Sequence, residues 1–152
     1  MSMAMTGAIT ALLLVVAWYD MRWLRIPNAL VLLGLALFVA CAPFLTTTDI
    51  VLRMTAGAVV FAVALIAFSM RLMGGGDAKF LPVLTLFISP LQWQMALILL
   101  AVGVVGTIAL LAVARRIPVA ARADFRAIAH PDRMPMGPAF AAAGIGPMLM
   151  TL

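Results

Sequence analysis

The chain has 152 residues, a length that predicts a single domain. Hydrophobic residues make up 66% of it and charged residues 10%, whereas soluble domains average roughly 45–50% apolar and about 25% charged residues. A soluble fold of this size exposes too much surface to hide so many apolar side chains, so the composition excludes a water-soluble globule, a disordered chain and a disulfide scaffold. We therefore expect an all-α, polytopic membrane protein in one domain, residues 1–152. The net charge of +5 is better explained by basic cytoplasmic loops than by nucleic-acid binding.

Apolar stretches predict the membrane-spanning helices, each of which needs about 20 mostly apolar residues. No basic segment precedes the first stretch, so we expect it to stay as a helix and not to be cleaved as a signal peptide. The stretches are Met3–Tyr19, Ala29–Leu45, Met54–Met73, Phe80–Ala114 and Met136–Leu152.

The fourth stretch, Phe80–Ala114, is long enough to be one span or two. As one span, it would place the five arginines of residues 115–136 outside the cell, against the preference of basic loops for the cytoplasm. As two spans with a turn near Ser89–Gln92, it puts nine Lys and Arg residues on one side and only Arg53 on the other. We therefore predict six spans, with the N-terminus outside and loops 20–28, 71–79 and 115–136 in the cytoplasm. The fourth span, residues 77–89, is then unusually short.

Two of the five aspartates stand next to predicted membrane helices on the cytoplasmic side. Asp20 follows the first span and Asp77 begins the fourth, and ionisable groups at membrane depth are functional candidates. Two carboxylates that converge can share one proton, which suits them to activate a water and polarise a peptide carbonyl. On topology alone, the same residues could be interfacial side chains that balance nearby cations. No cysteine and histidine cluster has metal-ligand spacing, so we expect neither a metal nor a cofactor.

Three motifs give the chain a resemblance to a known family. The run Gly74-Gly75-Gly76-Asp77-Ala78-Lys79 resembles the GxGDxK signature of type IV prepilin peptidases. Residues 20–28, an Asp followed by basic residues and Ile26-Pro27-Asn28, resemble the first motif of that family. Residues 134–144 look like its closing PxGP pattern. The chain resembles the short form of the family that is associated with tight-adherence (Flp) pilus systems.

The resemblance implies a function in pilus assembly and protein secretion. It implies that Asp20 and Asp77 are catalytic, and that the enzyme cleaves the basic leader of prepilins or pseudopilins at the cytoplasmic face of the bacterial inner membrane. Gly74, Gly75, Gly76, Lys79, Pro27 and Asn28 are expected to support the site or bind substrate. Methyltransferase activity, which belongs to longer members with an added cysteine-containing region, is not expected. The chain also has a remote resemblance to the presenilin group, but it lacks the Pro-Ala-Leu motif of that group.

Helix dipoles suggest which aspartate carries the shared proton. Asp77 stands near the start of a helix, where an anion is favoured, and Asp20 stands near the end of one. This predicts Asp77 as the base and Asp20 as the protonated partner. Two rival functions remain at this point, a small transporter or proton channel that uses the aspartates as a relay and a non-catalytic assembly subunit. The sequence leaves the oligomeric state open.

Overall fold

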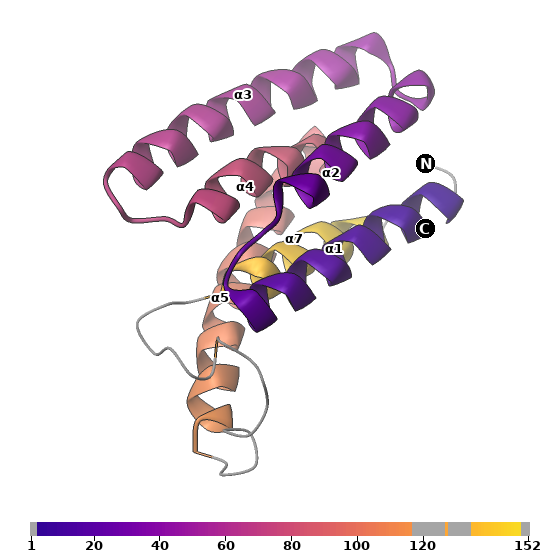
Figure 1. The fold of residues 1–152 in the computed structure, drawn as a ribbon. Helices are drawn as coiled ribbons and strands as arrows, with labels where there is room; N and C mark the ends of the chain where they lie inside the picture. Colours follow the sequence, from indigo (N-terminus) through magenta and orange to yellow (C-terminus); the bar gives the residue numbers. More distant parts are fainter. Residues whose placement is uncertain (1–2, 117–126, 128–134, 150–152) are drawn as a thin grey trace.

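A computed structural model describes residues 3–116, 127 and 135–149 (Figure 1). The regular elements of these residues are all helical, as expected. Most of the predicted loop 115–136 and the end of the last predicted span lie outside the described residues. In chain order the elements are α1 (Met3–Trp23), α2 (Asn28–Cys41), η1 (Ala42–Phe44), α3 (Thr47–Ser69), α4 (Gly75–Phe87), η2 (Pro90–Gln92), α5 (Trp93–Ala114) and α7 (Gly137–Leu149).

Two helical segments of the described chain are long and apolar enough to cross a membrane, namely α3 and the run of η2 and α5 over Pro90–Ala114. In each, only 17% of the most apolar window is buried inside the protein, so most of these side chains face outward. The third predicted span was misplaced, because α3 begins at Thr47 and not at Met54. Its start is set by Thr46, whose Oγ1 accepts a hydrogen bond from the Asp49 backbone N–H at 3.1 Å and so caps the helix.

The long apolar run is divided as predicted, and α4 is a separate helix of 13 residues. It ends at Phe87, after which the chain is extended at Ile88 and turns through η2. Arg53, which we expected in an outer loop, is instead a buried residue of α3. Its Nη1 donates a hydrogen bond of 2.9 Å to the carbonyl oxygen of Leu86, in the last turn of α4. A helix can end at membrane depth only where its free carbonyls find partners in the protein, and Arg53 supplies one.

The helices are arranged around α4 and α7 (Figure 1). The central α4 packs along α3 and buries seven of its side chains, and α7 packs against both α1 and α5. The two groups meet in an apolar core where the rings of Phe80 on α4 and Phe140 on α7 lie 5.9 Å apart between centroids. The C-terminal part of α5 projects away from the other helices.

Small residues allow α5 and α7 to pack closely. A Cβ atom on Gly103 would lie 2.8 Å from the Cα of Ala139, whereas a Cβ on Gly106, one turn later, would meet no atom within 4 Å. We expect Gly103→Ala to destabilise the fold by about 1–3 kcal/mol, because the two helices must separate. Gly106→Ala should be neutral or slightly stabilising, since alanine favours the helix. Thermal unfolding of both variants in detergent tests this pair, and equal melting temperatures would contradict it.

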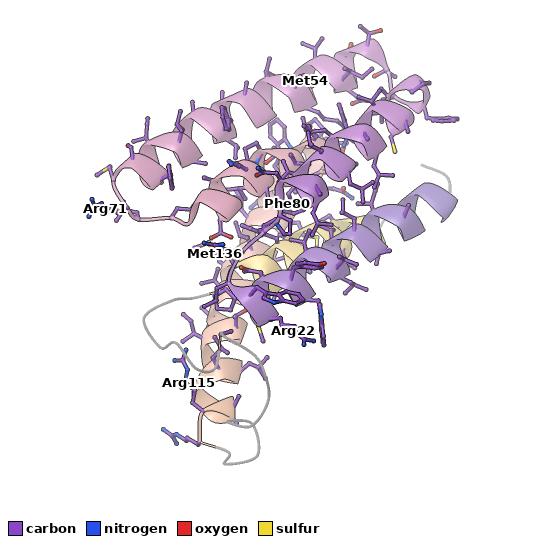
Figure 2. All side chains as sticks on the ribbon, viewed as in Figure 1. Arg22, Met54, Arg71, Phe80, Arg115 and Met136 are labelled. Carbon is purple, nitrogen blue, oxygen red and sulfur yellow. The ribbon has the colours of Figure 1, made fainter. Side chains whose placement is uncertain are left out.

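Several chain segments from different parts of the sequence meet at one end of the bundle. The end of α1, the start of α2, the connection from α3 to α4 and the start of α7 all lie there (Figure 1). Two residues with positive φ, Leu24 at 53° and Arg71 at 61°, end α1 and α3 and turn the chain into these connections. Figure 2 shows Arg71 and Met136 at this same end.

Candidate active site

The converging segments enclose an open cleft of about 1330 Å³. Its walls are formed by Asp20 in the last turn of α1, residues 24–28 leading into α2, residues 68–69 at the end of α3, residues 71–74 of the following connection, residues 75–77 at the start of α4, and Met136 before α7. Asp20 and Asp77, 57 positions apart in the chain, therefore line the same space. Both carboxylates lie outside the two helical segments that are apolar and long enough to cross a membrane.

Asp20 is held from the side of α7. Only 4% of its surface is exposed, and its Oδ2 accepts a hydrogen bond of 2.7 Å from the backbone N–H of Gly137, the first residue of α7. A Cβ atom on Gly137 would lie 2.8 Å from the Cβ of Asp20 and 2.9 Å from the Cα of Ala17. Glycine is thus the residue that lets α7 begin this close to α1.

Asp77 lies in the first turn of α4 and is more exposed than Asp20. Gly74 is the N-cap residue of this helix, and a Cβ atom there would lie 2.8 Å from Oδ2 of Asp77. The carboxylate thus folds back over the start of its own helix, where the free N–H groups and the helix dipole favour a negative charge.

The electrostatics of the two carboxyl groups differ. Burial, followed by the negative charge of Asp20, raises the pKa of Asp77 to about 7, and the backbone N–H of Gly74 offsets part of this rise. Burial also raises the pKa of Asp20, while the backbone N–H groups of Gly137 and Met136 lower it. Burial thus favours the protonated form of each carboxyl group, and the charge of Asp20 adds to this effect at Asp77.

The glycines at 74–76 leave room for neighbouring atoms. They do not serve to allow unusual backbone angles, because none of the described glycines has a positive φ. A Cβ on Gly74 would meet the carboxylate of Asp77, and one on Gly76 would lie 3.0 Å from the backbone nitrogen of Ile26 across the cleft. A Cβ on Gly75 would meet only the ring of Phe68, at 3.2 Å. The first and third glycines are thus the restricted positions, and the second has a neighbour that can move.

The remaining predicted site residues surround the cleft. Pro27 is the N-cap of α2, with φ −62° and ψ 142°, and ends the extended entry to that helix. Asn28 is the first residue of α2, and the helix start has no side-chain cap. The Oδ1 of Asn28 instead accepts a hydrogen bond of 3.2 Å from Nζ of Lys79. Lys79 does not line the cleft, and its bond ties α4 to the start of α2 beside the site.

The residue that sequence reasoning missed is Gly137. It lies in the closing PxGP motif, whose resemblance to the family was noted without a role in the site. The available signal was Met136-Gly137-Pro138, a helix start with no capping side chain of its own. Among the described residues, no group of three or more His, Cys, Asp or Glu side chains could hold a metal ion.

Comparison with known families identifies the chain. A model of the type IV leader peptidase family matches residues 7–111, more than half of the sequence. The chain belongs to the type IV leader peptidase family. No curated protein and no solved structure matches it. The matched range includes Asp20, the three glycines and Asp77, whereas α7 follows it. Membership in the leader peptidase family indicates a peptidase, and together with the two long apolar helical segments it indicates a membrane protein.

Proposed function

We propose that this leader peptidase is a membrane aspartic endopeptidase that removes the basic leader of prepilins or pseudopilins. In this proposal Asp20 and Asp77 are the catalytic residues, water is the nucleophile, and no metal or cofactor takes part. The observation that carries it is a cleft at one end of a helical bundle that is lined by carboxyl groups from two different helices. Membership of the type IV leader peptidase family supports the substrate class.

Among the described side chains that line the cleft, the two aspartates are the ones suited to act as general acid and general base. Ser69 is the one hydroxyl among the described residues that line it, and its Oγ donates to the carbonyl oxygen of Ile66 at 2.7 Å. Cys41 is buried in the apolar core and does not line the cleft. In hydrolysis, one carboxylate takes a proton from water while the hydroxide attacks the peptide carbonyl carbon, and the protonated partner donates its proton to the carbonyl oxygen.

The membrane arrangement belongs to the same proposal. Six spans put the cleft at the cytoplasmic face of the bacterial inner membrane, with the N-terminus outside. The short α4 fits because it is surrounded by protein, where a helix shorter than the bilayer can end. The substrate's apolar helix is expected to enter from the lipid bilayer beside the cleft, since the rim includes Arg25 and Arg71 and does not attract a basic leader.

A reconstituted cleavage assay tests the function. The purified protein in lipid would be mixed with a synthetic prepilin that has a basic leader followed by an apolar helix, and products would be identified by mass spectrometry. We expect one cut at the end of the leader. Absence of cleavage across several pilin substrates, from protein shown to be folded by its thermal transition, would overturn the proposal. Proton flux through vesicles holding the same protein would then favour the transporter.

The pH dependence of cleavage follows from the pKa of Asp77, which is raised to about 7. Asp77 holds a proton below this value and loses it above, so cleavage should decline as the pH rises through about 7. The folded state also binds this proton more tightly than the unfolded chain, so stability should fall as the pH rises toward 7. Rates and melting temperatures measured from pH 5 to pH 9 test both effects. Asp77→Asn should lose this pH dependence of the melting temperature, and an unchanged dependence would contradict the assignment.

A further inference from the structure

The start of α7 has no capping group of its own. Met136 is its N-cap residue, because the Met136 carbonyl accepts the first helical hydrogen bond, from Phe140 N–H at 3.0 Å. Methionine has no side-chain oxygen to cap the helix, and Pro138 has no N–H. The free N–H of Gly137 is instead satisfied by Asp20, 117 positions earlier in the chain, at 2.7 Å. Asp20 thus serves as the N-terminal cap of a helix to which it does not belong.

This contact changes the comparison between the two aspartates. Each carboxylate lies at the positive end of a helix, Asp77 at α4 and Asp20 at α7. Asp20 has a short N–H donor from another helix at 2.7 Å, whereas the backbone N–H that favours ionised Asp77 is that of Gly74, at the start of its own helix. Asp20 is only 4% exposed, and because burial disfavours a charge, this hydrogen bond is what favours its ionised form. A hydrogen bond from a backbone N–H is stronger when its acceptor is ionised. The expectation from α1 and α4 alone, that Asp20 carries the proton, omitted the end of α7.

We propose that Gly137 is a positioning residue whose backbone N–H holds Asp20 as the ionised member of the pair, leaving Asp77 to carry the shared proton. Asp20 then takes the proton from water, and Asp77 donates its own to the substrate carbonyl. This assignment rests on the proposed function and specifies which aspartate is the base and which is the acid. Glycine suits the position because any Cβ would push Asp20 and Ala17 away from the helix start.

The charged neighbours of Asp20 are few in the described chain. Asp77 faces it from α4, and its charge disfavours a second ionised carboxylate. Arg25 and Arg71 line the same cleft from the two connections, and Lys79 is bonded to Asn28. The segment Gly137–Leu149 itself contains no charged residue. The segment Gly137–Leu149 therefore stabilises ionised Asp20 only through the N–H groups at the start of α7.

An amide-to-ester replacement at residue 137 tests the proposal, because it removes the N–H without adding a side chain. It can be introduced by ligating a synthetic C-terminal segment to the expressed chain, giving the full-length protein. The matched control is the same replacement at Phe140, which removes a helical N–H of α7 that does not contact Asp20. We expect the acid limb of the cleavage pH profile to move up by about 1 unit or more for residue 137, and to stay in place for residue 140.

A second readout does not depend on cleavage. Isotope-edited infrared titration of labelled Asp20, in an Asp77→Asn background, should show Asp20 protonated at a higher pH in the residue 137 ester than in its all-amide counterpart. Equal shifts for residues 137 and 140, or no shift at 137, would overturn the proposal. Titration of the unmodified pair showing the shared proton on Asp20 would also overturn it. If the protein cleaves no prepilin but the titration still shifts, the proposed function fails while the assignment of the charge stands.

Discussion

Replacing either Asp20 or Asp77 by asparagine is expected to lower prepilin cleavage by about 10²–10⁴-fold, the usual contribution of a general acid or base. Asparagine keeps the shape and an acceptor oxygen, so Asp20→Asn still accepts the Gly137 N–H and should keep α7 in place. Because the two carboxyl groups act as one unit, the double variant should be little worse than the poorer single variant. Initial rates for the three variants, measured in the same lipid, check both expectations.

Asp49 provides the matched control. It is a partly exposed aspartate at the start of α3, where its Oδ2 accepts from Oγ1 of Thr46 at 2.8 Å, and it does not line the cleft. Asp49→Asn should cleave at the wild-type rate. If Asp20→Asn or Asp77→Asn remained fully active with a normal thermal transition, the pair would not be catalytic. If both losses multiplied in the double variant, the two groups would act independently.

The glycine run should respond to alanine in a graded way. Gly74→Ala brings a methyl group to 2.8 Å from Oδ2 of Asp77, and Gly76→Ala brings one to 3.0 Å from the backbone nitrogen of Ile26. A misplacement of about 1 Å can cost roughly 10²-fold in rate, so we expect losses of about 10–10²-fold for these two variants. Gly75→Ala should stay close to wild type, because the ring of Phe68 at 3.2 Å can rotate away.

Gly74→Ala and Gly76→Ala should lose activity for different physical reasons, and their melting temperatures distinguish the two. Gly74→Ala displaces a side chain, so its melting temperature should remain near that of the wild type while kcat falls. Gly76→Ala presses on backbone across the cleft and should lower both quantities. Gly7→Ala, in α1 with no atom within 4 Å of the added Cβ, is the control for a change of glycine to alanine in a helix. Equal activity of the Gly74, Gly75 and Gly76 variants would contradict the spatial explanation of the motif.

The sequence predicted the all-helical class of the fold, and it named both aspartates and the three glycines that line the cleft. Amino-acid composition alone implied apolar helices, and Pro90 with the arginine count correctly divided the run 80–114 into two helices. The boundaries were less predictable, as Thr46 shows. Its side chain starts α3 seven residues before the predicted span, because capping depends on a hydrogen bond and not on hydropathy. Arg53 was misplaced for a related reason, since its partner, Leu86, lies 33 residues away.

For the candidate site, the sequence by itself pointed to the residues proposed to carry the chemistry, because Asp20 and the run Gly74–Asp77 are local motifs that can be read along the chain. Only the tertiary structure decided what surrounds each carboxylate. Hydrophobic packing of α7 against α1 brings the N–H of Gly137 to Asp20, and helix ends act over one turn only, so no pattern near Asp20 could reveal this donor. In the proposed assignment the balance of charge between the two aspartates is a property of helix packing, although the aspartates themselves are evident in the sequence.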